Sequence, residues 1–179
     1  MSVWHQRLLI AGVAIAAAAA GVWNSLHKHR PAEAPRTEVV KKLFSSTLTD
    51  ADGTAQPLSQ WSGSWLVVNF WATWCLPCRE EMPAFSRLSQ RYRDRGVRFL
   101  GLAIDTPEPV RAFQKTTPVS YPLLIGGADA IQLSSEFGNL SQGMPFTVVI
   151  DPSGHVVRTR LGRYDEHELD AVLQELAVK

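Results

Sequence analysis

The sequence is poor in cysteine, and this scarcity limits what the two present can do. Cys75 and Cys78 are the only cysteines among 179 residues, three positions apart. A structural zinc site needs four ligands, but there is no second cysteine pair and no histidine near this one in sequence. A static disulfide across so short a loop would remove little entropy from the unfolded chain. We therefore favour a redox-active pair over zinc, a structural bridge or two incidental buried thiols.

An excess of charge of either sign is also missing. Lysine and arginine total 18 residues and aspartate and glutamate 17, a formal net charge of +1. Nucleic-acid binding needs a clustered basic surface. The arginine-rich stretch 87–95 is interrupted by Asp94 and falls on a predicted helix, so we interpret it as a solvated helix face. We expect no nucleic-acid partner.

Long apolar runs are missing as well, with one exception at the start of the chain. Residues 8–23 are uncharged and rich in alanine; as a helix they would span about 24 Å, slightly less than a bilayer core. We expect residues 1–26 to be a membrane anchor or a cleaved signal segment, and the lack of a polar region before the small-residue cleavage sites favours the anchor. Residues 27–42, with two prolines and no apolar period, predict a linker. Residues 43–179 predict the folded domain.

The residues around the two cysteines place them at the start of a helix. Four apolar residues in succession, 65–68, predict a strand at 64–70 that is buried on both faces. Apolar residues also recur at helical spacing between about 76 and 95. Backbone N–H groups at a helix N-terminus favour a thiolate over a thiol. We expect Cys75 to be the exposed nucleophile and Cys78 the buried resolving thiol, with Leu76 and Pro77 forming the loop between them.

The remaining patterns predict a mixed sheet flanked by helices, an α/β fold. Asp52-Gly53 indicates a hairpin within 43–58. Further strands are expected at 97–104, 121–125, 146–151 and 155–161, and further helices at about 107–116 and 128–137. A last helix begins at a capping box formed by Asp165 and Glu168.

Two separated segments resemble one known family. Residues 67–83, VVNFWATWCLPCREEMP, resemble the active-site segment of the TlpA/ResA-like thioredoxins, and residues 143–154, GMPFTVVIDPSG, resemble that family's cis-proline strand and the turn after it. The resemblance covers about residues 43–176. It implies a thioredoxin fold with an N-terminal β-hairpin and a central insertion. It also implies a thiol–disulfide oxidoreductase, and we expect neither a cofactor nor a metal.

The resemblance implies roles for residues near the cysteines. Pro145 would follow a cis peptide bond beside the cysteine pair, so that Met144 presents backbone groups to an extended substrate. Trp74 would pack beside the sulfur of Cys75 and shape the surface. These three residues are the expected substrate-binding positions.

A carboxyl group is expected to handle the proton. Cytoplasmic thioredoxin has a buried acid six residues before the nucleophile, where this chain has Asn69, which cannot titrate. Members of the resembled family often have a glutamate three residues after the second cysteine, which is Glu81 here. We predict that Glu81 hinders thiolate formation or relays a proton to Cys78; a solvated glutamate in the first helical turn is the alternative.

The resemblance further implies a single-pass protein of the bacterial inner membrane with its catalytic domain in the periplasm, or a secreted periplasmic protein after signal cleavage. Because Leu76 and Pro77 carry no charge, we expect a reductant. Its substrates would be protein disulfides or cysteines, as in apocytochrome c or copper-site proteins, and its electron donor a membrane carrier of the DsbD/CcdA type. The cytochrome-maturation branch, however, carries an acidic residue after the cis-proline, where this chain has Phe146 and Thr147.

Two other functions stay open at this stage. A disulfide oxidant or isomerase would use the same cysteine pair with a higher reduction potential. A Cu(I)-binding metallochaperone would use the two thiolates as soft ligands, with His155 and His167 as the only distal candidates for a further ligand.

Overall fold

The computed structural model describes the backbone of residues 33–177 and the side chains of residues 36–176. Its helices are α2 (Glu33–Ser45), α3 (Leu76–Tyr92), α4 (Pro107–Thr116), α5 (Gly127–Glu136) and α6 (Glu166–Ala177). Its strands are β1 (Thr47–Asp50), β2 (Ala55–Pro57), β3 (Trp65–Trp71), β4 (Val97–Ala103), β5 (Leu123–Ile125), β6 (Phe146–Ile150) and β7 (Val156–Leu161). The predicted elements are present, and the predicted α/β class is confirmed.

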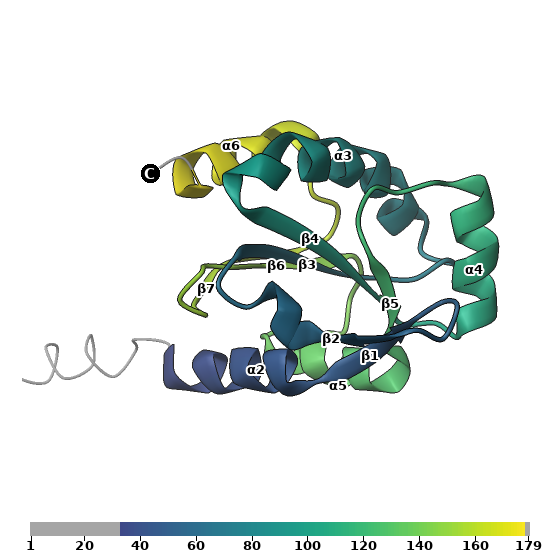
Figure 1. Cartoon of the computed structure of the whole chain (residues 1–179), viewed down its shortest axis with the longest axis horizontal. Coiled ribbons are helices and arrows are strands. Elements are labelled where there is room, and N and C mark those ends of the chain that lie inside the picture. Colours follow the sequence, from purple (N-terminus) through teal and green to yellow (C-terminus); the bar gives the residue numbers. More distant parts are fainter. Residues whose placement is uncertain (1–32, 178–179) are drawn as a thin grey trace, which may run out of the picture. The chain divides into compact units, whose positions relative to one another are not determined.

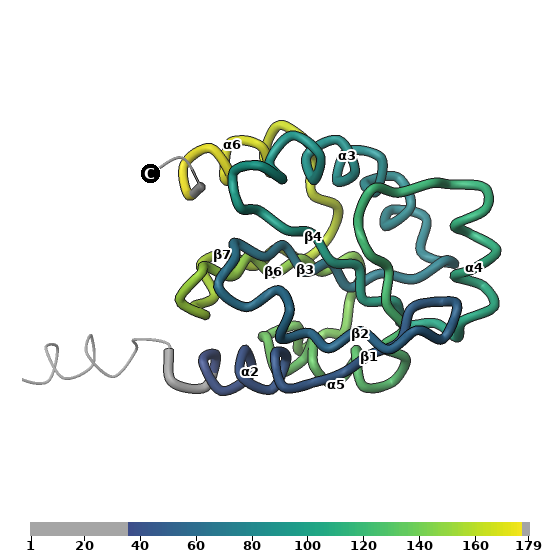
Figure 2. The backbone as a smooth tube through the Cα atoms, viewed as in Figure 1, coloured from purple at the N-terminus to yellow at the C-terminus, as the bar shows by residue number. Residues whose placement is uncertain are grey.

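The strands form one mixed sheet in the order β2-β1-β5-β4-β3-β6-β7. Strands β3, β4 and β5 run parallel, whereas β6 pairs antiparallel with β3, and β7 pairs antiparallel with β6. The predicted hairpin around Asp52-Gly53 is β1 and β2, and it joins the sheet because β1 pairs antiparallel with β5. Figure 2 lets the reader follow the chain from this hairpin into β3.

Helices cover both faces of the sheet, with α3 and α6 on one side and α2 and α5 on the other (Figure 1). Side chains of β3 alternate between the two cores: Val67 and Trp71 pack with α3 and α6, while Val68 and Phe70 pack with α2 and α5. Because β3 is buried on both faces, its residues are apolar at every position except Asn69. This covered strand ends at the cysteine pair.

Helix α2 corrects the prediction of a linker at 27–42. The prediction is wrong from Glu33 onward, where the chain is helical through Ser45. Pro35 is the third residue of α2, and the first N–H groups of a helix have no intrahelical partner, so a proline there costs little. Val40 and Leu43 lie on one face of α2 and are buried in the core. The folded domain therefore begins earlier than residue 43.

The end of α3 and the start of α6 lie where they were predicted, but their hydrogen bonds differ in part from those expected. Helix α3 passes into a short 3₁₀ turn at Arg93–Arg95 and ends at Gly96, whose φ of 77° is the left-handed conformation that glycine tolerates. At the start of α6, Asp165 Oδ1 accepts a hydrogen bond from the His167 N–H at 2.9 Å, as a cap should. Glu168, the other half of the predicted capping box, instead pairs with Arg160.

The four arginines of the stretch 87–95 are exposed, as predicted for a solvated face. Arg87 pairs with Glu166 and Arg91 with Asp170, both on α6. These ion pairs join two neighbouring helices. Arg93 donates to the Ser120 carbonyl, and Arg95 lies over the ring of Tyr92. Exposed pairs of this kind contribute little to stability, because water and salt screen them.

The membrane segment predicted for residues 1–26 lies outside the described residues. Within residues 33–177, no helix combines the length and the apolar character needed to cross a membrane.

The burial of α2 can be tested with Leu43→Ala. Leu43 is fully buried, so we expect the free energy of unfolding to fall by about 2–5 kcal/mol, as for other large-to-small core substitutions. Urea denaturation of the oxidised protein measures this. Lys41→Ala on the exposed face of the same helix is the matched control and should change the value by less than about 0.5 kcal/mol. Equal stability of the two variants would show that α2 is not part of the core.

Candidate active site

Cys75 and Cys78 form a disulfide at the junction of β3 and α3, with their Cα atoms 5.3 Å apart. Cys75 is the N-cap residue of α3, and its Sγ accepts a hydrogen bond from the Cys78 N–H at 3.3 Å. Cys78 is fully buried, and Cys75 exposes only 7% of its surface. Cys75 is thus the more accessible sulfur, although less exposed than predicted. A free helix N–H aimed at Cys75 Sγ stabilises a thiolate at that atom in the reduced form.

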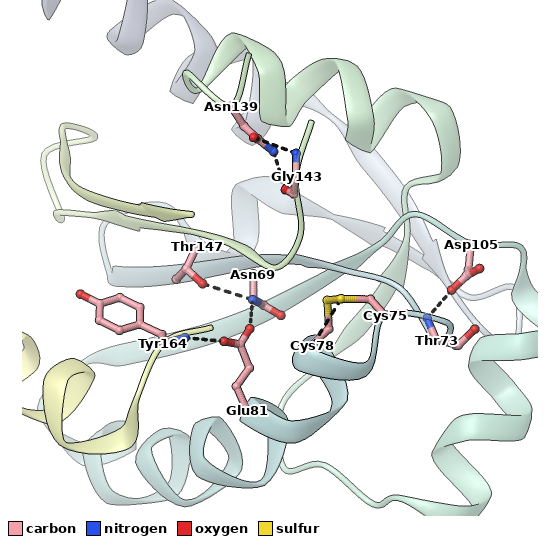
Figure 3. Close-up of a disulfide and its surroundings, with 10 residues drawn as sticks. All are labelled: Asn69, Thr73, Cys75, Cys78, Glu81, Asp105, Asn139, Gly143, Thr147 and Tyr164. Carbon is pink, nitrogen blue, oxygen red and sulfur yellow. Dashed lines mark hydrogen bonds between the residues drawn. A yellow bond between two sulfur atoms is a disulfide. The ribbon is translucent and has the colours of Figure 1, made fainter. Parts of the chain in front are cut away.

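The turn before the disulfide is held from a neighbouring strand. Asp105 follows β4, and its Oδ2 accepts a hydrogen bond from the Thr73 N–H at 2.6 Å (Figure 3). Thr73 lies two residues before Cys75, so this carboxylate fixes the path of the chain into the active-site turn. Asp105 was not among the predicted site residues.

The two tryptophans of the active-site segment have different environments. Trp71 is fully buried, and its ring lies 5.0 Å from that of Phe113 on α4. Trp74 exposes 66% of its surface and Leu76 exposes 57%. The residues on either side of Cys75 therefore form an apolar rim that projects into solvent.

The predicted cis-proline segment, residues 143–146, lies beside the cysteine pair. The Met144–Pro145 peptide bond is cis, as the resemblance implied. Met144 is half-buried and packs against the apolar cluster that contains both cysteines. The Pro145 carbonyl accepts a hydrogen bond from the Gly162 N–H at 2.8 Å. Fold and packing thus bring the segments of residues 71–78 and 143–146 together.

Glu81 is buried, with 1% of its surface exposed, so the alternative of a solvated glutamate is wrong. Its Oε1 accepts a hydrogen bond from Asn69 Nδ2 at 2.8 Å, and its Oε2 accepts one from the Tyr164 N–H at 2.7 Å. The same Asn69 amide group donates to Thr147 Oγ1 at 3.2 Å. Figure 3 shows the side chains of Asn69, Glu81 and Thr147 converging from β3, α3 and β6, while the backbone N–H of Tyr164 approaches from the segment before α6. Glu81 follows Cys78 by three residues, so their side chains are neighbours on one helix face.

Burial raises the pKa of Glu81 to about 7, because an ionised carboxylate loses hydration there. The hydrogen bonds from Tyr164 and Asn69 and the charge of Arg163 act in the opposite direction and lower the pKa. The desolvation effect is the larger. A carboxyl group whose pKa lies near neutrality can both accept and donate a proton in its working range.

Several members of this network were absent from the predicted site. Tyr164 contributes a backbone N–H and Thr147 a hydroxyl, neither of which a residue pattern reveals. The burial of Glu81, however, had a signal: it stands three residues after Cys78 and four before Phe85, on the same helical face. Among residues 33–177, no group of three or more His, Cys, Asp or Glu is placed to hold a metal.

A dithiol at the N-terminus of a helix, beside a cis-proline strand in a mixed sheet, defines a thiol–disulfide oxidoreductase of the thioredoxin fold. A family model described as "AhpC/TSA family" matches residues 39–159, and the chain belongs to that family. Within it, the chain is a ResA-like thiol–disulfide oxidoreductase.

Similarity to individual known proteins supports this assignment. The chain is 28% identical to "Thiol-disulfide oxidoreductase ResA" of Bacillus cereus, over 96% of this chain and 97% of that protein. It is 31% identical to "Thioredoxin-like protein YneN" of Bacillus subtilis, over 71% of this chain and 74% of that protein. The crystal structure of a thioredoxin-related protein from Neisseria meningitidis superposes with a TM-score of 0.65 at 36% identity, covering 74% of this chain and 99% of that one.

The raised pKa of Glu81 predicts how stability depends on pH. Because the folded state holds this proton more tightly than the unfolded chain, the contribution is fully present below about pH 4.5 and is lost as pH rises toward about 7. Across that window the wild type should lose about 3 kcal/mol relative to Glu81→Gln, since each pKa unit is worth about 1.4 kcal/mol. Urea denaturation of both oxidised proteins between pH 4.5 and 8 measures the difference. Parallel pH curves would contradict a raised pKa.

Proposed function

We propose that this protein reduces disulfides in other proteins outside the cytoplasm while tethered to the membrane by its N-terminal segment. The observation that carries the direction of electron flow is the setting of the cysteine pair. A buried carboxyl group lies one helical turn from Cys78, and neither Leu76 nor Pro77 carries a cationic group that would stabilise a thiolate. The helix N-terminus stabilises the Cys75 thiolate, but the two residues between the cysteines add nothing to that stabilisation. This limited stabilisation of the reduced form favours the disulfide in this protein, and therefore favours giving electrons away.

The reaction has two exchange steps. The Cys75 thiolate attacks one sulfur of a substrate disulfide, forms a mixed disulfide with it and releases the other substrate sulfur as a thiolate. Cys78 then loses its proton and attacks Cys75 Sγ, which closes the Cys75–Cys78 disulfide and releases the second substrate sulfur. Two electrons pass from this protein to the substrate. Both substrate sulfurs leave as thiolates, which take protons from solvent, while the proton of Cys78 stays on the group that accepts it in this protein.

Glu81 is suited to the second step. Cys78 is fully buried, so its thiol cannot readily give its proton to bulk water. An ionised Glu81 can take that proton, and the bonds from Asn69 and Tyr164 hold its carboxylate in place. In the resting disulfide, the same carboxyl group accepts a proton near neutral pH. Glu81 thus couples proton movement to the opening and closing of the bridge.

The substrate chain is proposed to lie along Met144. Pro145 has no N–H, and its cis bond turns the chain so that Met144 lies beside the cysteines, where its backbone can pair with an extended segment. Apocytochrome c and copper-site proteins are the candidate substrates, and a membrane carrier of the DsbD/CcdA type is the candidate electron donor. Phe146 and Thr147 differ from the cytochrome-maturation branch, so copper-site proteins are the better match.

The reduction potential of the Cys75/Cys78 couple tests the direction. On a scale from about −270 mV for thioredoxin to about −120 mV for DsbA, we expect a value at or below about −230 mV. Equilibration with glutathione and dithiothreitol buffers measures it. A value above about −160 mV would mean that the pair donates disulfides, and the oxidant or isomerase would replace the reductase.

Glu81→Gln tests the proton step. We expect closure of the Cys75–substrate mixed disulfide by Cys78 to slow by about 100-fold at pH 8, since general base catalysis contributes factors of this size. In the wild type this rate should rise as pH increases through about 7, and the variant should lose that rise. Stopped-flow measurement of thiol release gives the profile. Glu80→Gln, a change at the neighbouring exposed carboxylate, is the control; a wild-type profile in Glu81→Gln would exclude the proposed relay.

A further inference from the structure

Four large apolar side chains are exposed in the described part of the chain, and each belongs to a segment next to the active-site turn or the cis-proline strand. They are Trp74, Leu76, Leu140 and Leu161. Trp74 and Leu76 flank Cys75 in sequence. Leu140 and Leu161 belong to the two segments on either side of the cis-proline strand, because Leu140 lies in the loop before it and Leu161 pairs in register with Phe146. Exposed large apolar side chains that border a reactive site are candidates for binding a partner.

Leu140 stands out among them because 87% of its surface is exposed and its loop is fixed. The neighbouring Asn139 is buried, and its side-chain amide binds both backbone groups of Gly143. Asn139 Oδ1 accepts from the Gly143 N–H at 3.1 Å, and Nδ2 donates to the Gly143 carbonyl at 2.9 Å. One side chain thus closes residues 139–143 into a ring (Figure 3). A leucine at the tip of a closed loop loses little entropy when a partner covers it.

The same loop is joined to the active site and to Leu161. Gly143 leads directly to Met144, which packs against the cluster containing both cysteines. A Cβ placed on Gly143 would lie 3.0 Å from Leu161 Cδ1, so the leucine of β7 closes over this glycine. The segment that would pair with the substrate backbone is therefore bordered by apolar side chains from two directions.

The chemistry of this border indicates what it would bind. Residues 137–148, FGNLSQGMPFTV, contain no charged side chain. The arginines next to Leu161 already have acidic partners, since Arg160 pairs with Glu168 and Arg163 with Glu80. Burying a leucine-sized side chain of a partner is therefore the favourable contact that this border offers. Since the disulfide reacts with cysteine-containing polypeptides, the occupant that fits is an uncharged, extended stretch of a substrate protein.

We propose that Leu140, on the loop closed by Asn139, together with Leu161 forms an apolar subsite that selects substrate cysteines flanked by large apolar residues. This inference rests on the proposed reaction with protein disulfides. Asn139 is a positioning residue in this subsite, and Leu140 makes the contact. Backbone pairing at Met144 would hold any extended chain, so the subsite supplies the preference among sequences.

Two peptides of equal length and charge test the proposal. Each has one cysteine in a mixed disulfide with 5-thio-2-nitrobenzoate, flanked by leucines in one peptide and by serines in the other. The reduced protein, prepared with dithiothreitol, takes up the peptide sulfur on Cys75 and releases the coloured nitrobenzoate thiolate, which is followed by stopped flow. We expect the wild type to react about tenfold faster with the leucine peptide, the factor for one leucine-sized apolar contact.

Variants locate that preference. Leu140→Ser should bring the ratio of the two rate constants close to one, and Leu140→Met, which keeps an apolar side chain, should retain most of it. Asn139→Ala should also lower the ratio, because the loop is no longer closed. Gln90→Ser, a truncation at an exposed position near the far end of α3, should keep the wild-type ratio. Working with ratios removes any general change in thiol reactivity.

The outcomes separate this inference from the function it rests on. If the wild type reacts with both peptides at the same rate, or if Leu140→Ser keeps the wild-type ratio, the apolar subsite is wrong while disulfide exchange stands. If the reduced wild type reacts with neither peptide, the proposed reaction with polypeptide disulfides fails, and the subsite fails with it.

Discussion

The structure depends on one junction, where the buried strand β3 ends and α3 begins. Cys75 stands at this point as the N-cap of α3, and the Cys78 N–H points at its sulfur. A helix N-terminus lowers the cost of a negative charge on that sulfur, but only if the helix start is held in place. Packing of β3 on both faces and the Asp105 carboxylate on the Thr73 N–H hold it. The scaffold on both sides of the sheet therefore serves to fix the geometry of one turn.

A buried carboxyl group beside this junction costs stability, which explains the number of its partners. An unpaired carboxylate in an apolar core would be strongly unfavourable. Glu81 instead has donors from Asn69 and from the Tyr164 N–H, which keep it oriented whether or not it is ionised. Desolvation still dominates and holds its pKa near neutrality. The compromise leaves a proton acceptor next to Cys78, where bulk water does not reach.

The features that could be predicted from the sequence are those that depend on a few consecutive residues. The apolar run of β3, the cysteine spacing and the helical period of α3 are properties of a few consecutive residues, and they were enough to place the dithiol. Helix α2 was not predicted because its segment contains prolines and shows no clear apolar period. A proline in a first turn does not break a helix, and Val40 and Leu43 form the apolar face that packs into the core. Asn139 and Tyr164 could not have been found, because their roles depend on loops and backbone groups that only the folded chain brings together.

Substrate binding, sulfur exchange and substrate preference depend on different groups at the surface of the site. Backbone pairing beside Pro145 depends on the shape of an extended chain and is nearly indifferent to its side chains. The sulfur chemistry is equally indifferent, because any accessible disulfide can react. Preference among substrates must then come from the side chains that border the cysteines, and those borders are apolar: Trp74 and Leu76 beside Cys75, with Leu140 and Leu161 beyond Met144. Proton handling lies beneath this surface at Glu81, so recognition and catalysis can vary independently on the same scaffold.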